Sequence, residues 1–572
     1  MSELPGEGSE AADPQDGGTA PAPDSMRRKR RRRLFAVAFG LLPFVVLEVG
    51  LRLFGVGSAN DDVHAGFGNA SPLFERNNAE GVYETSLAKQ QFFVSQKFAI
   101  KKPENEFRIF CLGGSTVQGR PYRPETSFGK WLELELNAAD SSRHYQAINC
   151  GGISYASYRL RRVLQEVLQY DPDLILLATG HNEFLEDRTY SSVRERSALR
   201  RTVESAAMSL KTVQVLRRAV GGGPRVEPTD DTPATSDSVE ARLDDEAGYA
   251  SYHRDEEWHQ QVVEQYSDSV DQMLQMCHSA SVPVVAVRLG SNLRDCPPFK
   301  SEHAHGLSVE DQQRWQTLFD EATKVETNDA AAALSIYERA ERIDDQHPLL
   351  HFRIARCYDR LGRFSEAYNS YRAARDLDIC PLRMTTAMSS EFARLATTHD
   401  VAMVDAESLI IANSIDGIPG YRSYIDHVHP TIEAHQTIAR AVGDTLRETG
   451  LVETKTQLTP SDRREVFREH LDYLGPTYFS NGRRRIGWLE AWARRQRLWD
   501  ETLPYDTRSF VAAAVRAIDL HDYETADQHL TAAITGDAAA MDALRDASDA
   551  LVEQGRTTDA KWILERLKTS IK

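Results

Sequence analysis

Residues 107–116 read FRIFCLGGST: a short apolar run, two glycines, then a serine and a threonine. A β-rich run with apolar side chains on both faces is typical of a buried strand in a parallel sheet. The glycines permit a tight turn from strand to helix, which would present the Ser115 hydroxyl above the sheet, beside a helix N-terminus that favours negative charge. The alternative role for a serine at this place is an N-cap.

Further apolar runs alternate with amphipathic stretches along the chain. The runs are 145–149, 174–178, 282–287 and 401–404, and the amphipathic stretches include 130–136, 158–170, 258–277 and 431–447. Strands that alternate with helices predict an α/β domain with a parallel sheet covered on both faces. We therefore expect a doubly wound five-stranded sheet whose ligand crevice lies beyond the carboxyl ends of the strands.

Polar groups follow three other strands. Residues 149–155 read NCGGISY, a turn of small residues whose backbone N–H groups could face an anion, and 179–183 read TGHNE. Asn182 is a candidate side-chain donor, with an Asx turn as the alternative. Residues 424–431 read YIDHVHPT, directly before the last helix of the domain. The spacing of Asp426 and His429 lets the carboxylate hold one ring nitrogen and leaves the other for a nucleophile.

Two other features belong to the same edge of the sheet. Asn292 and Arg294 follow the fourth strand, where they could bind substrate oxygens; a solvated loop is the alternative. His427 and His429 could form a metal-binding pair, but no Cys, Asp or His cluster supplies further ligands at a recognisable spacing. We therefore expect neither a metal nor another cofactor.

Together the four blocks resemble the SGNH (GDSL-like) hydrolase family, over roughly residues 80–447 apart from two insertions. The resemblance implies a flavodoxin-like sheet and a serine hydrolase that acts on ester bonds. It also implies a role for each site residue: Ser115 as nucleophile, His429 as general base and then acid, Asp426 as the orienting carboxylate, and Asn182 with the backbone N–H groups of Ser115 and Ser154 as oxyanion donors.

Three positions depart from the family pattern. Ser154 stands where the second block usually has glycine; the group required there is a backbone N–H, which serine also supplies. Glu183 stands where aspartate is usual, and Gly113-Gly114 precede the serine in place of Gly-Asp.

Composition sets the broad class of the protein. The chain has 572 residues, enough for two to four domains, and a mean hydropathy of −0.47, which excludes a polytopic membrane protein. Its 68 basic and 85 acidic residues give a net charge of −17, which argues against a nucleic acid partner. The six cysteines form no CxxC pair, so isolated buried thiols are expected, with one or two disulfides as the alternative.

The N-terminus carries a membrane signal. Residues 1–33 form a tail that is rich in Gly, Pro, Ala and acidic residues, is expected to be disordered and ends in seven consecutive cationic residues. Residues 34–57, which start with fourteen uncharged residues, are long enough to span a bilayer as one helix. The basic run predicts a cytoplasmic N-terminus, a single-pass anchor in the inner (cell) membrane, and a periplasmic or otherwise extracytoplasmic catalytic domain. A cleaved signal peptide and a basic tail that binds nucleic acid are the alternatives.

Helical repeats flank the end of the α/β domain. Within 348–378, small and aromatic residues fall at the spacings of a 34-residue tetratricopeptide unit, and part of the pattern recurs 34 residues upstream at Ala333, Tyr337 and Ala340. We expect inserted repeats at 305–385 and C-terminal repeats at 506–570, with a linker at 448–505. The hydrolase domain then comprises 80–304, with a disordered loop at 219–247, and 386–447. Alanine-rich hairpins with chance spacing are the alternative. Such short arrays favour docking on the α/β domain or on a protein partner.

These patterns predict a membrane-anchored extracytoplasmic serine esterase that removes or transfers an acyl group. Its substrate would be an acylated glycan of the cell envelope, acetyl being one candidate group, or a small ester. A non-catalytic scaffold whose repeats recruit envelope partners is the opposing hypothesis. A lipase is the third, though no long apolar lid segment is evident.

Overall fold

A five-stranded parallel sheet forms the centre of the α/β domain. The structure, a computed structural model, describes residues 71–186, 248–495 and parts of 511–570. The sheet has the order β5-β4-β6-β7-β8, and every neighbouring pair is parallel. The strands are β4 (Glu106–Gly113), β5 (His144–Gly151), β6 (Leu174–Ala178), β7 (Val284–Arg288) and β8 (Ala402–Asp405). This is the doubly wound order expected from the alternation of strands and helices, and it reverses at β4, the strand before Ser115.

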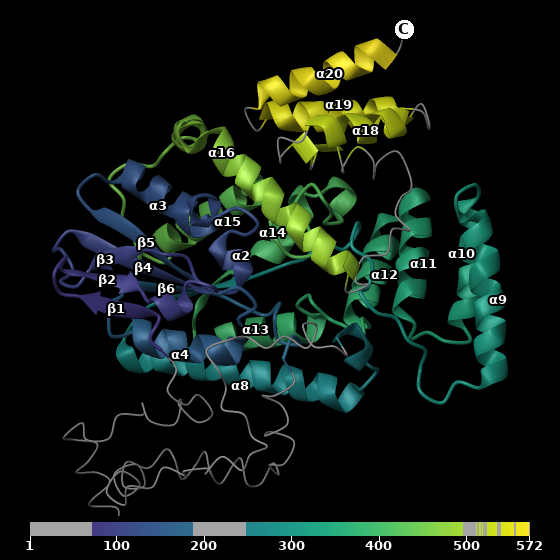
Figure 1. The fold of residues 1–572 in the computed structure, drawn as a ribbon, viewed down its shortest axis with the longest axis horizontal. Helices are drawn as coiled ribbons and strands as arrows, with labels where there is room; N and C mark the ends of the chain where they lie inside the picture. Colours follow the sequence, from purple (N-terminus) through teal and green to yellow (C-terminus); the bar gives the residue numbers. More distant parts are fainter. Residues whose placement is uncertain are drawn as a thin grey trace, which may run out of the picture. The chain divides into compact units, whose positions relative to one another are not determined.

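Helices cover both faces of the sheet (Figure 1). One layer contains α4 (Ser157–Val167), α8 (Glu256–Ala280) and α13 (Thr386–Thr398); the other contains α3 (Phe128–Ala139) and α15 (Ile432–Glu448). Successive side chains of β4 enter different cores, because strand residues alternate between faces. Phe110 joins a core with Tyr266 of α8, whereas Ile109 joins one with Trp131 of α3. The apolar run that opens the domain is therefore buried on both sides.

A three-stranded antiparallel sheet precedes the α/β domain. It consists of β1 (Phe74–Asn77), β2 (Val82–Thr85) and β3 (Lys97–Ala99). The Glu166 carboxylate of α4 accepts hydrogen bonds from the backbone N–H groups of Leu73 and Phe74, at 2.7 and 2.8 Å. These strands are short and carry charged residues, so they lack the apolar runs that indicate the other strands.

The insertion is formed by two antiparallel helix pairs. They are α9 (Val309–Glu326) with α10 (Ala330–Glu341), and α11 (Pro348–Arg360) with α12 (Phe364–Asp376). The small residues Ala333, Ala355 and Ala367 are fully buried, so each helix approaches its neighbour closely. Gly362, between α11 and α12, has a φ of 72°, which glycine adopts without strain.

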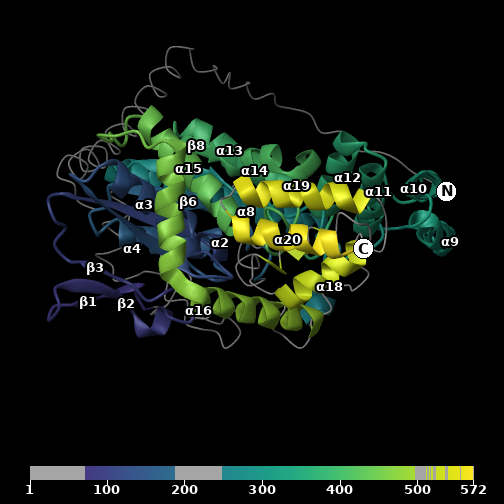
Figure 2. The same ribbon diagram turned by 90° about the horizontal axis from the view of Figure 1, so that it is seen from above.

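Residues 448–505, which are predicted to be a linker, contain a long helix, α16 (Pro460–Arg495). Its direction changes at Gly475, which has a φ of 68° and precedes Pro476, and Figure 2 shows the bend. Phe467, before the bend, packs against Trp131 with ring centroids 4.7 Å apart. A Gly-Pro step and a high charge content are typical of linkers. The local sequence therefore gives no indication of the contact between α16 and α3.

The C-terminal helices are α18 (Tyr523–Ile534), α19 (Ala539–Glu553) and α20 (Thr557–Ser570). Their core includes Ala526, Leu530, Leu551 and Ala560, which lie within the range 506–570 where C-terminal repeats are predicted. The predicted tail, the anchor at 34–57 and the loop at 219–247 lie outside the described residues. Within the described ranges, no helix is both long and apolar enough to cross a membrane.

Candidate active site

Ser115 is the first residue of the short helix α2 (Ser115–Gln118), directly beyond strand β4. Gly114 is the N-cap, so the Ser115 side chain does not cap the helix. Glycine is required at 113, because a β-carbon there would lie 2.1 Å from the carbonyl oxygen of Ala178 on β6. The close approach of these strands presents the half-buried serine at the carboxyl edge of the sheet.

The loop before α15 holds Asp426 and His429 in a tight turn. The N–H of Ile425 donates to the carbonyl of His429 at 2.7 Å. One carboxylate oxygen of Asp426 accepts the backbone N–H groups of Val428 and His429, both at 2.9 Å. The other carboxylate oxygen accepts the His429 Nδ1–H at 2.5 Å. Burial by itself would raise the pKa of the Asp426 carboxyl, but the neighbouring imidazoles and these hydrogen bonds hold it below its ordinary value.

The second ring nitrogen of His429 faces the serine. Its Nε2 atom lies 2.8 Å from the Ser115 Oγ atom, although 314 positions separate the two residues in the chain. Since Asp426 holds Nδ1 as the donor, Nε2 is free to accept the hydroxyl proton. The structure thus brings Ser115, His429 and Asp426 together in one hydrogen-bonded chain, and His429 is 6% exposed.

The second block supplies a candidate oxyanion donor. Ser154 has a φ of 60°, the left-handed conformation that glycine adopts at little cost, so the serine keeps the turn despite the substitution. The turn is held against β4 by the N–H of Gly152, which donates to the carbonyl of Gly113 at 2.9 Å. Within residues 71–186 and 248–495, neither the Ser154 nor the Ser115 backbone N–H has a hydrogen-bond acceptor.

The third block places an amide beside the serine turn. The Asn182 Nδ2 atom donates to the carbonyl of Tyr155 at 3.0 Å, which fixes the direction of the amide and leaves its second N–H available. A β-carbon on Gly114 would lie only 2.6 Å from the same nitrogen. Asn182 is therefore packed against the residue that precedes Ser115, as an oxyanion donor would have to be.

Glu183 has a structural role that its sequence position alone did not predict. Its carboxylate is buried and accepts both the backbone N–H and the hydroxyl of Ser157, each at 2.8 Å. It thereby joins the third block to the start of α4. Burial raises the pKa of Glu183 to about 7, partly offset by these two hydrogen bonds. The sequence signal for this role is a carboxylate directly after the Gly180-His181-Asn182 turn.

Asn292 and Arg294 do not have the substrate-binding placement expected from sequence. Asn292 is fully buried; its Nδ2 atom donates to the backbone carbonyl of Asp426 at 3.2 Å, and its N–H donates to the carbonyl of His427 at 3.0 Å. Arg294 forms a two-point ion pair with Asp359 of α11, at 2.8 and 2.9 Å. Asn292 thus supports the Asp426–His429 loop through hydrogen bonds to its backbone carbonyls. Arg294 links the insertion to the α/β domain.

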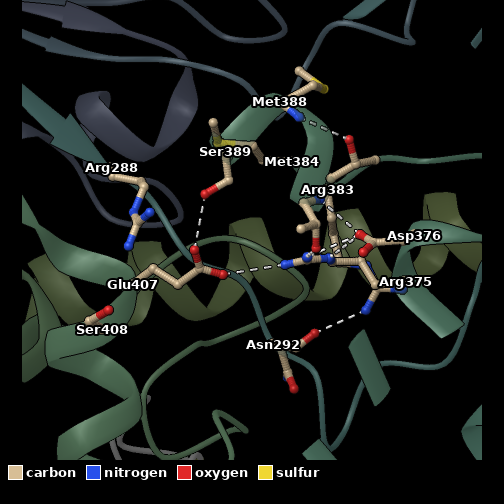
Figure 3. Close-up of polar contacts among 12 residues, drawn as sticks. Arg288, Asn292, Arg375, Asp376, Arg383, Met384, Met388, Ser389, Glu407 and Ser408 are labelled. Carbon is tan, nitrogen blue, oxygen red and sulfur yellow. Dashed lines mark hydrogen bonds and ion pairs between the residues drawn. The ribbon is translucent and has the colours of Figure 1, made fainter. Parts of the chain in front are cut away.

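A second arginine extends this support (Figure 3). Arg383 follows the last helix of the insertion and is 2% exposed. Its guanidinium donates to the carbonyls of Asn292 and Cys296, both at 2.9 Å, and lies 3.5 Å from the Asp378 carboxylate. The next residue, Met384, donates its N–H to Nδ1 of the buried His181 at 3.1 Å. The end of the insertion therefore contacts the 179–183 block directly, at His181, and the Asp426–His429 loop through Asn292.

His427 is not part of a metal cluster in the described portion of the chain, where no group of three or more His, Cys, Asp or Glu residues could hold a metal ion. Its ring meets Phe299 edge-on, with centroids 5.2 Å apart. Burial lowers its pKa to about 4, although Asp426 opposes the shift. The six cysteines are free thiols, all of them buried.

Comparisons with known proteins bear on both parts of the chain. Residues 324–377 match the tetratricopeptide repeat family. Among curated proteins, none matches the chain.

Solved structures similar to the chain include a protein described as a GDSL-like lipase from Parabacteroides merdae, with 11% identity and a TM-score of 0.28, covering 62% of this chain and 99% of its own. The acetyl xylan esterase AlAXEase has 11% identity and a TM-score of 0.27, covering 59% and 100%. A catalytic mutant of the acetylxylan esterase Axe2 from Geobacillus stearothermophilus has 10% identity and a TM-score of 0.26, covering 61% and 97%.

Proposed function

We propose that the chain is a serine esterase of the SGNH type, with Ser115, His429 and Asp426 as its catalytic residues. The observation that supports it is the hydrogen-bonded chain from the Asp426 carboxylate through His429 to the Ser115 hydroxyl, at 2.5 and 2.8 Å. A serine hydroxyl is a weak nucleophile near neutral pH, and this arrangement supplies the base that it needs.

In the proposed reaction, His429 Nε2 takes the hydroxyl proton while Ser115 Oγ attacks the acyl carbon. Charge develops on the carbonyl oxygen, where the Asn182 amide and the N–H groups of Ser115 and Ser154 donate to it; each such donor contributes about 3–4 kcal/mol to the barrier reduction. His429 returns the proton to the departing alcohol. Water, or an acceptor alcohol in a transferase, then resolves the acyl-enzyme by the same steps.

The test is covalent labelling of the full-length protein. A fluorophosphonate should react at Ser115, because the serine oxygen displaces fluoride from phosphorus only when it is activated. Ser115→Ala should abolish both the label and the hydrolysis of short-chain esters. A folded protein that does not label at Ser115 would contradict the proposal and favour the scaffold hypothesis.

For substrate and location we propose an acyl group, such as acetyl, on a cell-envelope glycan, reached by an ectodomain anchored through 34–57. The seven cationic residues before that segment support an inner-membrane anchor with a cytoplasmic N-terminus and the catalytic domain outside, in the periplasm. We further propose that the repeats bind a protein partner.

Asn60→Cys tests the orientation, because all six native thiols are buried and should not react. An impermeant maleimide should label Asn60→Cys in intact cells once the outer layers of the envelope admit it. Labelling that requires permeabilisation of the cytoplasmic membrane would overturn the orientation.

A further inference from the structure

Two half-buried arginines beside the proposed site have few hydrogen-bond partners among the described residues. Among the described residues, the half-buried Arg120 guanidinium has neither a hydrogen-bond acceptor nor an ion-pair partner. Arg485 donates its Nε–H to the carbonyl of Pro121, yet its Nη2 atom is buried without any acceptor in that part of the chain. A buried donor without a partner costs free energy, so the Nη2 atom of Arg485 needs an explanation.

An apolar cluster brings the chain segments that carry both arginines to the catalytic loop. Tyr122, Ile425 and Ile486 are buried against one another, and they come from the turn after Ser115, the His429 loop and the second half of α16. Arg485 adjoins Ile486, while Arg120 lies two residues before Tyr122. The N–H of Arg120 also donates to the carbonyl of Ser115 at 3.1 Å.

Tyrosine packing fixes this part of α16 on the turn. Tyr478 stacks on Tyr122 with centroids 5.9 Å apart, and its hydroxyl bonds to Thr126 at 2.9 Å. A β-carbon on Gly482 would lie 2.5 Å from the Tyr122 ring. The helix carrying Arg485 therefore lies closely against the turn carrying Arg120.

The charges near the pair leave it positive. Arg123 and Arg484 add two cations close to Arg485, and Glu125 contributes one anion on that side. The Asp426 carboxylate lies near Arg120, but it already accepts three hydrogen bonds from its own turn. Such a cationic group stands out in a chain whose net charge is −17.

We propose that Arg120 and Arg485 bind an oxyanion, a carboxylate or a phosphate, carried by the ester substrate. Guanidinium forks match both groups geometrically. The inference rests on the proposed esterase function and deepens it, since it makes the substrate an acidic glycan or another anionic ester. Arg485 of α16 then becomes part of the substrate site.

A matched substrate set tests the inference on the full-length protein. The probes are an acetylated methyl glucoside, the acetylated methyl glucuronoside that replaces its hydroxymethyl group by a carboxylate, and the acetylated methyl glucoside 6-phosphate. Wild type should prefer at least one anionic ester by about tenfold to a hundredfold in kcat/KM, as expected for one or two charge-assisted hydrogen bonds. A preference for the glucuronoside identifies the oxyanion as a carboxylate, and a preference for the 6-phosphate identifies it as a phosphate.

Variants separate binding from chemistry. In Arg120→Gln and Arg485→Gln the ratio of anionic to neutral kcat/KM should fall towards one, mainly through KM, whereas Arg120→Lys and Arg485→Lys should retain part of it. Arg314→Gln, the same change on the exposed face of α9, should leave the ratio at the wild-type value. Equal rates on all three esters in wild type, or an unchanged ratio in both Gln variants, would overturn the inference.

The failure of the inference is distinguishable from failure of the proposed function. If Ser115 labels and the neutral ester is hydrolysed without anion preference, only the arginine assignment is wrong. If no ester is hydrolysed, calorimetric binding of the glucuronoside and the phosphate to Ser115→Ala, with and without Arg120→Gln, still tests the arginine pair: binding lost with Arg120 supports it, and no binding by either probe contradicts it.

Discussion

The side-chain amide of Asn182 occupies the space that a β-carbon on Gly114 would need, since the two atoms would lie 2.6 Å apart. Gly114→Ala should therefore displace the amide rather than the backbone. We expect kcat to fall by about a hundredfold to a thousandfold, the effect of losing one oxyanion donor. Ester kinetics with the melting temperature measured in parallel would check this.

The neighbouring glycine is the matched control. At Gly113 a β-carbon would meet the backbone carbonyl of Ala178, which cannot move without opening the sheet. Gly113→Ala should lower the melting temperature much more than Gly114→Ala. If Gly114→Ala leaves kcat at the wild-type value, Asn182 is not a donor in the reaction.

The parts of this site that sequence predicts are those whose chemistry is local. Ser115 follows from its residue type at a strand end, because parallel strands bring their carboxyl ends to one edge. The Asp426–His429 pair follows from its three-residue spacing in the loop directly before α15. The role of Asn292 could not be inferred in this way. The local sequence around a polar residue in a crevice loop does not tell whether its side chain faces substrate or is buried against the catalytic loop, as the side chain of Asn292 is.

Contacts between distant segments explain the remaining differences. The helix α16 reads as a linker, since its Gly475-Pro476 step and its charges are visible locally, whereas its packing on Trp131 and Tyr122 is not. The strands β1 to β3 are short and polar, so they lack the pattern that identified the five central strands. The repeat, by contrast, is a local pattern, and residues 324–377 match its family.

Asp426→Asn should reverse the tautomer of His429. An amide nitrogen next to Nδ1 would donate to it, so Nε2 would carry the proton and could not accept one from Ser115. We expect a loss of roughly ten-thousandfold in kcat, with the fold retained. Fluorophosphonate labelling should slow in parallel. A variant that labels at the wild-type rate would show that Asp426 does not orient the base.

Arg383 should influence catalysis without touching substrate. Arg383→Met removes the donor to two carbonyls and leaves the Asp378 carboxylate buried without its cation, so we expect a loss of about 3–5 kcal/mol in unfolding free energy. Since Asn292 would lose one restraint, the rate of Ser115 labelling should also fall. Arg394→Met, on the exposed side of α13, is the control.

Arg383→Lys distinguishes positioning from stability. It keeps a charge for Asp378 but cannot bridge two carbonyls, so labelling should remain slow even where stability is partly restored. Labelling at the wild-type rate in a variant that is clearly destabilised would confine Arg383 to a structural role.

Glu183 should make stability depend on pH near neutrality. Its pKa is raised to about 7 in the folded protein from an ordinary 4.5, so between these values the folded state binds a proton that the unfolded state lacks. Stability should therefore fall as pH rises from 4.5 to 7. Glu183→Gln should remove this pH dependence. The free energy of unfolding measured in urea should therefore rise for the variant relative to wild type as pH increases from 4.5 to 7.

Ser157→Ala should strengthen the pH dependence that Glu183→Gln removes, because it alters the other side of the same contact. It removes the hydroxyl that donates to the ionised carboxylate, so the pKa of Glu183 should rise further and the pH-dependent loss should extend above pH 7. Because Glu183 joins the Asn182 block to α4, the same unfolding series reports on a contact that positions the proposed oxyanion donor. Identical pH slopes in wild type, Glu183→Gln and Ser157→Ala would mean that this carboxyl does not titrate in the window.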